Sequence, residues 1–116
     1  MIQQLIKNIS PSELLSETIE YKYYGYRLSA ITCTKKDNLE ITYSFSKEYG
    51  FIHLRLHIED TTEIESISLV YPYSFLYENE IKELFGVNIK NISVDFDNNL
   101  YRIAVKTPFN MKKEVE

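Results

Sequence analysis

The clearest pattern in the chain is an alternation of apolar and polar residues between positions 39 and 58. From Leu39 to Ser46, Leu, Ile, Tyr and Phe alternate with Glu, Thr and Ser. After a short turn at Glu48 to Gly50, Phe51 to Ile58 places Ile and Leu at every second position. Because side chains along a strand point alternately to its two faces, the pattern predicts a hairpin with one buried face.

Two further segments have the composition of strands. Tyr26 to Thr34 is rich in β-branched and aromatic residues, and a turn at Lys35 to Asn38 connects it to the hairpin. Glu65 to Tyr71 is a weaker candidate strand, with Ile67 and Leu69 on one face and serines on the other. We expect both segments to extend the same sheet.

Helical spacing replaces alternation in two places. A Ser-Pro-Ser-Glu sequence at residues 10–13 can cap a helix, which we place at residues 11 to 24 and end at Gly25. The second helix is expected from Ser74 to Phe85, with Gly86 at its end. Its apolar stripe consists of Tyr77, Ile81, Leu84 and Phe85.

Together these elements predict an α+β fold, with two main helices packed on a mostly antiparallel or mixed sheet of about four to six strands. A length of 116 residues suits one domain, and 44% hydrophobic residues can build a core. We place this domain at residues 1–110 and a charged tail at residues 111–116. Near its end, a turn at 97–99 separates residues 92–96 from the β-prone segment 100–106.

Charge and cysteine content exclude several classes of protein. A net charge of −4 and the absence of a basic stripe argue against nucleic-acid binding. Residues 1–9 mix polar with apolar residues, unlike a signal peptide, and no apolar run approaches the roughly 18 residues of a membrane span. The single cysteine, Cys33, excludes an internal disulfide and an iron–sulfur cluster held by this chain alone. We therefore expect a cytoplasmic protein that reaches a membrane only through partners.

Potential metal ligands do not form a site in the sequence. His53 and His57 lie on a predicted strand, where four residues span roughly 13 Å, too far for both rings to hold one ion. Residues 95–99 match the opening of a calcium loop, but Leu100 and Lys106 occupy the positions that need Gly and Glu. We expect a polar strand face and a solvated turn.

Nucleotide binding and cysteine chemistry also lack their signatures. Gly25, Gly50 and Gly86 are scattered instead of clustered between a strand and a helix, where backbone N–H groups could bind phosphate. Cys33 has no neighbour in sequence that would activate a thiol, so we expect a small core residue. The chain is therefore predicted to hold no cofactor.

Acidic residues on the second helix allow two interpretations. Glu78 and Glu80 fall on opposite flanks of the predicted apolar stripe, while Asn79 points away from it, as expected at the rim of an interface. Their place in the first two turns also suits the positive end of the helix dipole, so a purely helix-stabilising role remains equally open. Catalysis by paired carboxylates, with Glu83 as the third candidate, has less support.

Tyrosine is the compositional outlier, with ten residues against no tryptophan. The tyrosines concentrate at residues 21–26 and 71–77. Such clusters occur at protein interfaces because the ring buries area while the hydroxyl keeps a polar partner. They fit the edge of a core equally well, and both interpretations remain open.

The segment from Tyr71 to Val87 resembles the signature of the thirty-kilodalton subunit family of complex I, the NADH-quinone oxidoreductase. That signature runs Glu-Arg-Glu, two residues, an acidic residue, two apolar residues and often Gly. The matching residues are Glu78, Glu80, Glu83, Leu84, Phe85 and Gly86. Asn79 replaces the central Arg, and the Gly-His-Pro and Leu-Arg-Arg segment of quinone-reducing members is missing.

Residues 98–109 are similar to the carboxyl end of the small hydrophilic subunit of energy-converting, Ech-type nickel–iron hydrogenases. Gly25 to Leu28, Cys33 to Lys35, Tyr43 to Phe45 and the short total length are similar too. The resemblance implies an α+β accessory subunit docked on the hydrogenase large subunit, at the inner face of the cell membrane. It also implies that partner chains hold the nickel–iron and iron–sulfur centres, with no cofactor here.

The resemblance places the partner interface on the second helix and the segments flanking it. The expected interface residues are Tyr71, Pro72, Phe75, Tyr77, Glu78, Glu80, Glu83, Phe85, Gly86, Tyr101, Arg102, Lys106 and Phe109. Their partners would be the large subunit and neighbouring small subunits. Two alternatives remain: the thirty-kilodalton subunit of an NADH- or ferredoxin-quinone oxidoreductase-like complex, and a free-standing small-molecule-binding protein. The last would need a pocket with convergent polar groups, for which the sequence offers no candidate set.

Overall fold

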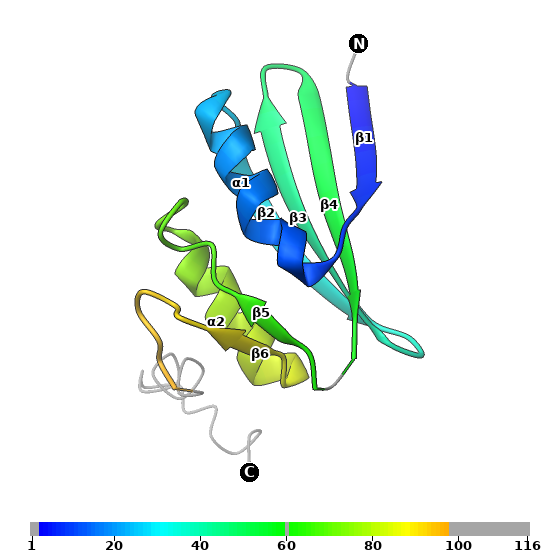
Figure 1. Ribbon diagram of the computed structural model, residues 1–116, viewed down its shortest axis with the longest axis vertical. Coiled ribbons are helices and arrows are strands. Elements are labelled where there is room, and N and C mark those ends of the chain that lie inside the picture. The colour runs from blue at the N-terminus through cyan, green and yellow to red at the C-terminus, as the bar shows by residue number, and fades with distance from the viewer. Residues whose placement is uncertain (1–2, 60, 98–116) are drawn as a thin grey trace, which may run out of the picture.

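A computed structural model describes residues 3–59 and 61–97 of the chain. Figure 1 shows α1 lying across a four-stranded sheet, with a smaller pair of strands beside α2. In chain order the elements are β1 (Gln3–Asn8), the 3-10 helix η1 (Pro11–Glu13), α1 (Leu14–Tyr23), β2 (Arg27–Lys35), β3 (Leu39–Lys47), β4 (Gly50–Ile58), β5 (Glu63–Glu65), α2 (Ser74–Phe85) and β6 (Asn88–Lys90). The predicted α+β fold with two main helices is confirmed.

The large sheet has the strand order β1-β4-β3-β2 and is mixed. Both β2 and β4 run antiparallel to β3, whereas β1 runs parallel to β4. The predicted hairpin pairs Tyr43 with Leu54 and Phe45 with Ile52, so apolar residues of both strands share one face. Tyr43, Phe45 and Leu54 are fully buried there, which confirms the predicted alternation.

Both α1 and the segment leading into α2 cover this apolar face. The ring of Phe45 lies 5.6 Å from that of Tyr21 in α1 and 5.5 Å from that of Tyr71, which precedes α2. At the start of the first helical segment, the Ser10 N–H donates to Glu13 Oε1 over 2.9 Å. This contact satisfies a backbone donor at the helix start, as the predicted capping box requires.

The segment from Glu65 to Tyr71 is not a strand of the large sheet, and that prediction is wrong. Only Glu63–Glu65 is extended, and it pairs in parallel with Asn88–Lys90 in a separate two-stranded sheet. Beyond it the chain turns, with the Val70 and Tyr71 N–H groups both donating to the Ile67 carbonyl at 3.0 and 2.9 Å. Those internal bonds use the groups that a strand would offer to a neighbour.

The amino-terminal strand β1 was not predicted. Its sequence, Gln-Gln-Leu-Ile-Lys-Asn, does not alternate, because β1 is an edge strand in which residues 4–8 are exposed on both faces. Lys7 nevertheless links it to α1 through an ion pair with Glu17, with Nζ and Oε2 3.0 Å apart. Both the boundary between residues 110 and 111 and the segment 100–106 lie outside the described residues.

Candidate functional site

The helix α2 has the predicted bounds but a different buried stripe. It ends at Gly86, whose φ of 70° is left-handed and whose N–H donates to the Lys82 carbonyl over 3.0 Å. Ser74, Glu78 and Ile81 are buried along its inner side, whereas Leu84 is 58% exposed. The inner stripe is therefore rotated away from the predicted one, and polar residues occupy two of its positions.

Glu78 lies in the interior, so its expected place on an exposed interface rim is wrong. Its carboxylate accepts hydrogen bonds from the Ser66 hydroxyl at 2.7 Å, the Ile67 N–H at 2.9 Å and the Ser74 hydroxyl at 3.3 Å. Burial raises the pKa of this carboxyl, and these three donors act in the opposite direction. Glu78 thus joins the turn before α2 to the helix itself.

Asn79 also points inward, contrary to the expectation from the helical wheel. Its side chain is fully buried and donates to the Phe75 and Val94 carbonyls at 2.7 and 2.8 Å. Its Oδ1 accepts from the Phe96 N–H at 2.9 Å. These bonds hold the chain after β6 against α2. The residue at the position of the signature's central Arg is therefore a structural link in this chain.

Tyr43 and Cys33 show what burial does to the remaining candidate groups. The Tyr43 hydroxyl is fully buried and makes no hydrogen bond within residues 3–59 and 61–97, and burial raises its pKa. Burial also raises the pKa of the Cys33 thiol to about 11, which keeps it protonated at neutral pH. Cys33 packs half-buried against the core, as expected of a small core residue.

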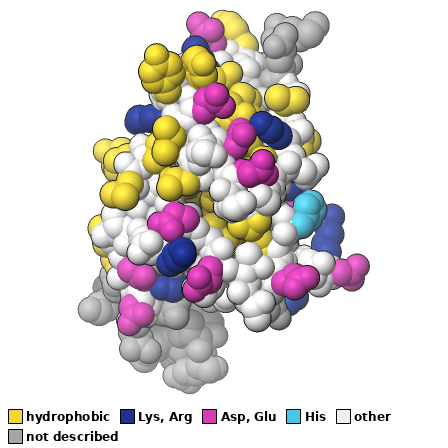
Figure 2. Space-filling view, viewed as in Figure 1, with side chains coloured by type: hydrophobic (Ala, Val, Ile, Leu, Met, Phe, Trp, Pro, Cys, Tyr) yellow, Lys and Arg dark blue, Asp and Glu magenta, His cyan; other side chains and the backbone are white. Residues whose placement is uncertain are grey.

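Opposite this inner side, the outer side of α2 and the loop before it expose large apolar residues. Leu69 is 85% exposed, Tyr73 80% and Leu76 49%. Figure 2 shows apolar side chains gathered on the side of α1 and of this loop, with acidic side chains scattered among them. A cluster of this kind is typical of an interaction surface.

A groove runs between the end of α1, the start of β2 and the start of α2. Its cavity volume is about 350 Å³. We call it the tyrosine groove, and its lining residues are Lys22, Tyr26, Arg27, Leu28, Tyr71, Pro72, Tyr73 and Tyr77. A second hollow, lined by Tyr73, Leu76, Tyr77 and Glu80, shares two of these residues and continues it along α2. Both tyrosine clusters of the sequence thus meet here.

The family of the chain follows from its match to a known family of respiratory proteins. A family model described as the 30 Kd subunit of respiratory-chain NADH dehydrogenase matches residues 9–113. The chain belongs to this family. A comparison with curated proteins finds no match. Membership in the 30 Kd subunit family supports a role as a subunit of a complex I-like oxidoreductase. None of the described helices is long and apolar enough to cross a membrane.

The expected interface residues of this family member separate into distinct groups. Tyr71, Pro72, Tyr77 and Glu80 line the tyrosine groove or its continuation. Phe75 packs on Phe96, with ring centroids 6.1 Å apart, which places it away from that groove. Two further groups lie apart from the groove or outside the described residues: Glu83, Phe85 and Gly86 at the end of α2, and Tyr101, Arg102, Lys106 and Phe109 in the undescribed segment.

Sequence reasoning missed the half of the groove that comes from α1 and β2. Lys22, Tyr26, Arg27 and Leu28 line it, although the expected interface included no residue before position 71. The dense tyrosines at 21–26 were the available signal. They remained ambiguous because Tyr21 is a core-edge residue stacked on Tyr26 and Phe45, whereas Tyr26 also faces the groove.

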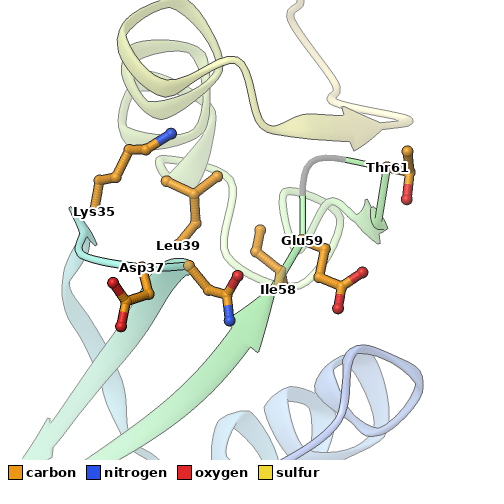
Figure 3. A pocket seen from close by; sticks show the side chains of 7 residues that line it. Lys35, Asp37, Leu39, Ile58, Glu59 and Thr61 are labelled. Atoms are coloured by element: carbon orange, nitrogen blue, oxygen red, sulfur yellow. The ribbon is translucent and has the colours of Figure 1, made fainter.

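Another cavity of the described structure lies at the far end of the sheet, between the β2–β3 turn and the end of β4 (Figure 3). Its charged side chains, Lys35, Asp37 and Glu59, point in different directions in this view. Convergent polar groups are the usual mark of a small-molecule site. This cavity does not bring such groups together.

The two histidines have separate partners on the polar face of the sheet. His53 Nδ1 lies 2.8 Å from Ser44 Oγ, its directly opposed residue on β3. His57 Nε2 lies 3.7 Å from Glu40 Oε2, an ion pair only when the ring is protonated. The expected polar strand face is confirmed. Among residues 3–59 and 61–97, no group of three or more His, Cys, Asp or Glu could hold a metal ion.

Proposed function

We propose that this chain is a non-catalytic accessory and assembly subunit in the peripheral arm of a membrane-bound, energy-converting nickel–iron hydrogenase related to complex I. The family match over residues 9–113 carries the proposal. Similarity of residues 98–109 to the small Ech-type subunit and Asn79 at the signature's Arg position favour a hydrogenase over a quinone reductase. The complex would lie at the cytoplasmic face of the cell membrane.

The docking surface for the large subunit would be the outer side of α2 with the loop before it. We define this outer face by Leu69, Tyr73, Leu76 and Glu80, all exposed. Aromatic and large aliphatic residues at the centre of an interface with charges at its border are the usual composition of a protein contact. The buried bonds of Glu78 support this surface from below, because they fix the preceding turn to the helix.

In this proposal the chain acts through mass action and holds no redox centre. A subunit that binds the folded large subunit but not its unfolded form stabilises it by RT ln(1 + [L]/Kd), about 2.7 kcal/mol at a hundredfold excess over Kd. The nickel–iron and iron–sulfur centres would belong to partner chains. Losing the chain should therefore lower the amount of intact complex, not the chemistry at each surviving nickel site.

Purification of the tagged chain from native membranes tests this function. We expect a hydrogenase large subunit and neighbouring small subunits to co-purify in stoichiometric amounts. Quinone-reductase chains in their place would contradict the hydrogenase assignment and support the alternative, the thirty-kilodalton subunit of an NADH- or ferredoxin-quinone oxidoreductase-like complex. Recovery of the chain alone would contradict both and favour a free-standing binding protein.

A deletion strain separates assembly from catalysis. We expect the abundance of the large subunit to fall while turnover per assembled nickel site stays unchanged. Normal abundance with a collapse of turnover per site would contradict the accessory role. Immunoblotting of the large subunit, together with hydrogen evolution normalised to nickel in the purified complex, measures the two quantities.

A further inference from the structure

The tyrosine groove is held open by hydrogen bonds of its own side chains. The Tyr71 hydroxyl donates to the Tyr26 carbonyl over 2.8 Å, and the Tyr77 hydroxyl donates to the Ser29 carbonyl over 3.3 Å. These two bonds tie the start of α2 to the start of β2, on opposite walls of the groove. A binding site fixed in this way loses little conformational entropy when it is filled.

The charge of the groove is opposite to that of the chain. Its lining includes Lys22 and Arg27 and no acidic residue, although the whole chain has a net charge of −4. Lys22 Nζ lies 4.9 Å from the centroid of the Tyr71 ring, and Lys47 Nζ lies 5.7 Å from that of Tyr26. Three cations therefore surround an aromatic floor, an arrangement that favours an anionic ligand.

From this geometry we propose that the tyrosine groove binds a short acidic segment of a partner protein. An apolar or aromatic side chain of that segment occupies the floor formed by Tyr26, Tyr71 and Tyr77, and its carboxylate pairs with Arg27 and Lys22. The planar guanidinium of Arg27 suits a carboxylate because it can donate two parallel hydrogen bonds. The proposal rests on the proposed function, in that it names the partner chemistry for the docking side of the molecule.

Charge argues against the chain's own carboxyl-terminal segment as the occupant. Residues 98–116 carry four cations against two carboxylates: Arg102, Lys106, Lys112 and Lys113 against Glu114 and Glu116. A segment with a net positive charge would be repelled by the cations of the groove. The acidic segment therefore comes from another chain.

Selection from a random library of twelve-residue peptides displayed on phage tests the proposal with the full chain and no knowledge of the partner. We expect enriched sequences that combine Asp or Glu with a neighbouring apolar or aromatic residue. A synthetic peptide of the enriched sequence should bind in fluorescence anisotropy, and its Gln/Asn counterpart should bind at least about threefold more weakly. Enrichment of sequences without acidic residues, or no enrichment, would overturn the proposal.

Charge variants of the chain locate the binding. Lys22→Gln combined with Arg27→Gln should weaken the acidic peptide about three- to tenfold, because each exposed ion pair contributes a small amount. Lys36→Gln removes an exposed cation from the β2–β3 turn and should change binding less than about twofold. Equal effects of the groove and control variants would contradict the assignment to the groove. All three side chains are exposed, so unchanged thermal unfolding verifies that folding is intact.

The outcomes separate this inference from the proposed function. Loss of acidic-peptide selectivity with normal co-purification of the large subunit would overturn the groove assignment alone. Selective peptide binding with no hydrogenase subunit in the native complex would overturn the hydrogenase assignment alone. A dimer in sedimentation velocity that the double variant dissociates would assign the groove to a second copy of this chain and contradict a partner segment.

Discussion

Glu78 and Glu80 lie two residues apart on α2, yet they belong to different regions of the molecule. Glu78 faces inward, is fully buried and receives hydrogen bonds from Ser66, Ile67 and Ser74. Glu80 faces outward and lines a surface hollow with Tyr73 and Leu76. Two similar carboxylates thus have different roles, because burial and partners decide the role and the residue type does not.

The largest effect should follow removal of the inner carboxylate. Glu78→Ala leaves the buried Ile67 N–H and two serine hydroxyls without their acceptor and opens a cavity, so we expect a loss of about 2–4 kcal/mol in the free energy of unfolding. Urea unfolding followed by circular dichroism measures it. Glu80→Ala, the matched outer variant, should cost less than about 1 kcal/mol. Equal losses for the two variants would contradict the distinction between the two sides.

A smaller loss is expected at the neighbouring inner residue. Asn79→Ala removes bonds to the Val94 carbonyl and the Phe96 N–H, which hold the chain after β6 against α2. We expect a destabilisation of about 1–3 kcal/mol. Hydrogen exchange should also show that protection is lost first in residues 92–97. Unchanged protection there would show that Asn79 does not hold this segment.

The pH dependence of stability should sharpen the contrast further. Burial raises the pKa of Glu78 above 4.5 in the folded chain, so the folded state binds more protons than the unfolded state between those two values. Its contribution to stability is therefore complete below pH 4.5 and is lost as the pH rises through the raised pKa. Glu78→Gln removes this titration.

The measurement is the difference in unfolding free energy between wild type and Glu78→Gln across a pH series. This difference, wild type minus variant, should fall as the pH rises above 4.5. The lowered pKa values of Glu13 and Asp95 act in the opposite direction, but they are common to both proteins and cancel. A difference that stays constant or rises would contradict a raised pKa at Glu78.

Local sequence signals predicted those elements whose signals are themselves local. The bounds of α2 follow from helical spacing and from Gly86, whose left-handed conformation ends the helix. The hairpin β3–β4 follows from strict alternation. In contrast, β5 has only three residues and pairs with a strand 25 positions further along the chain, so no neighbouring residue indicates it.

The candidate site was predicted in part for the same reason. Tyr71, Pro72 and Tyr77 were expected at the interface and line the groove, but its cationic half comes from α1 and β2, which only the fold brings to α2. Glu78 was misplaced because a helical wheel assigns charged residues to the outside. Its donors, Ser66 and the Ile67 N–H, lie on a turn whose structure the sequence pattern did not reveal.

The central claim is that the outer face of α2 docks on the large subunit, and one measurement tests it most directly. The amount of large subunit recovered per tagged chain from native membranes would be compared for wild type, Leu76→Asp and Ile19→Asp. Leu76 and Ile19 are similarly exposed, at 49% and 52%, but Ile19 lies on α1. We expect Leu76→Asp to lower recovery about tenfold, as for a central interface residue, and Ile19→Asp to change it less than about twofold. Equal recovery with all three proteins would contradict docking through α2.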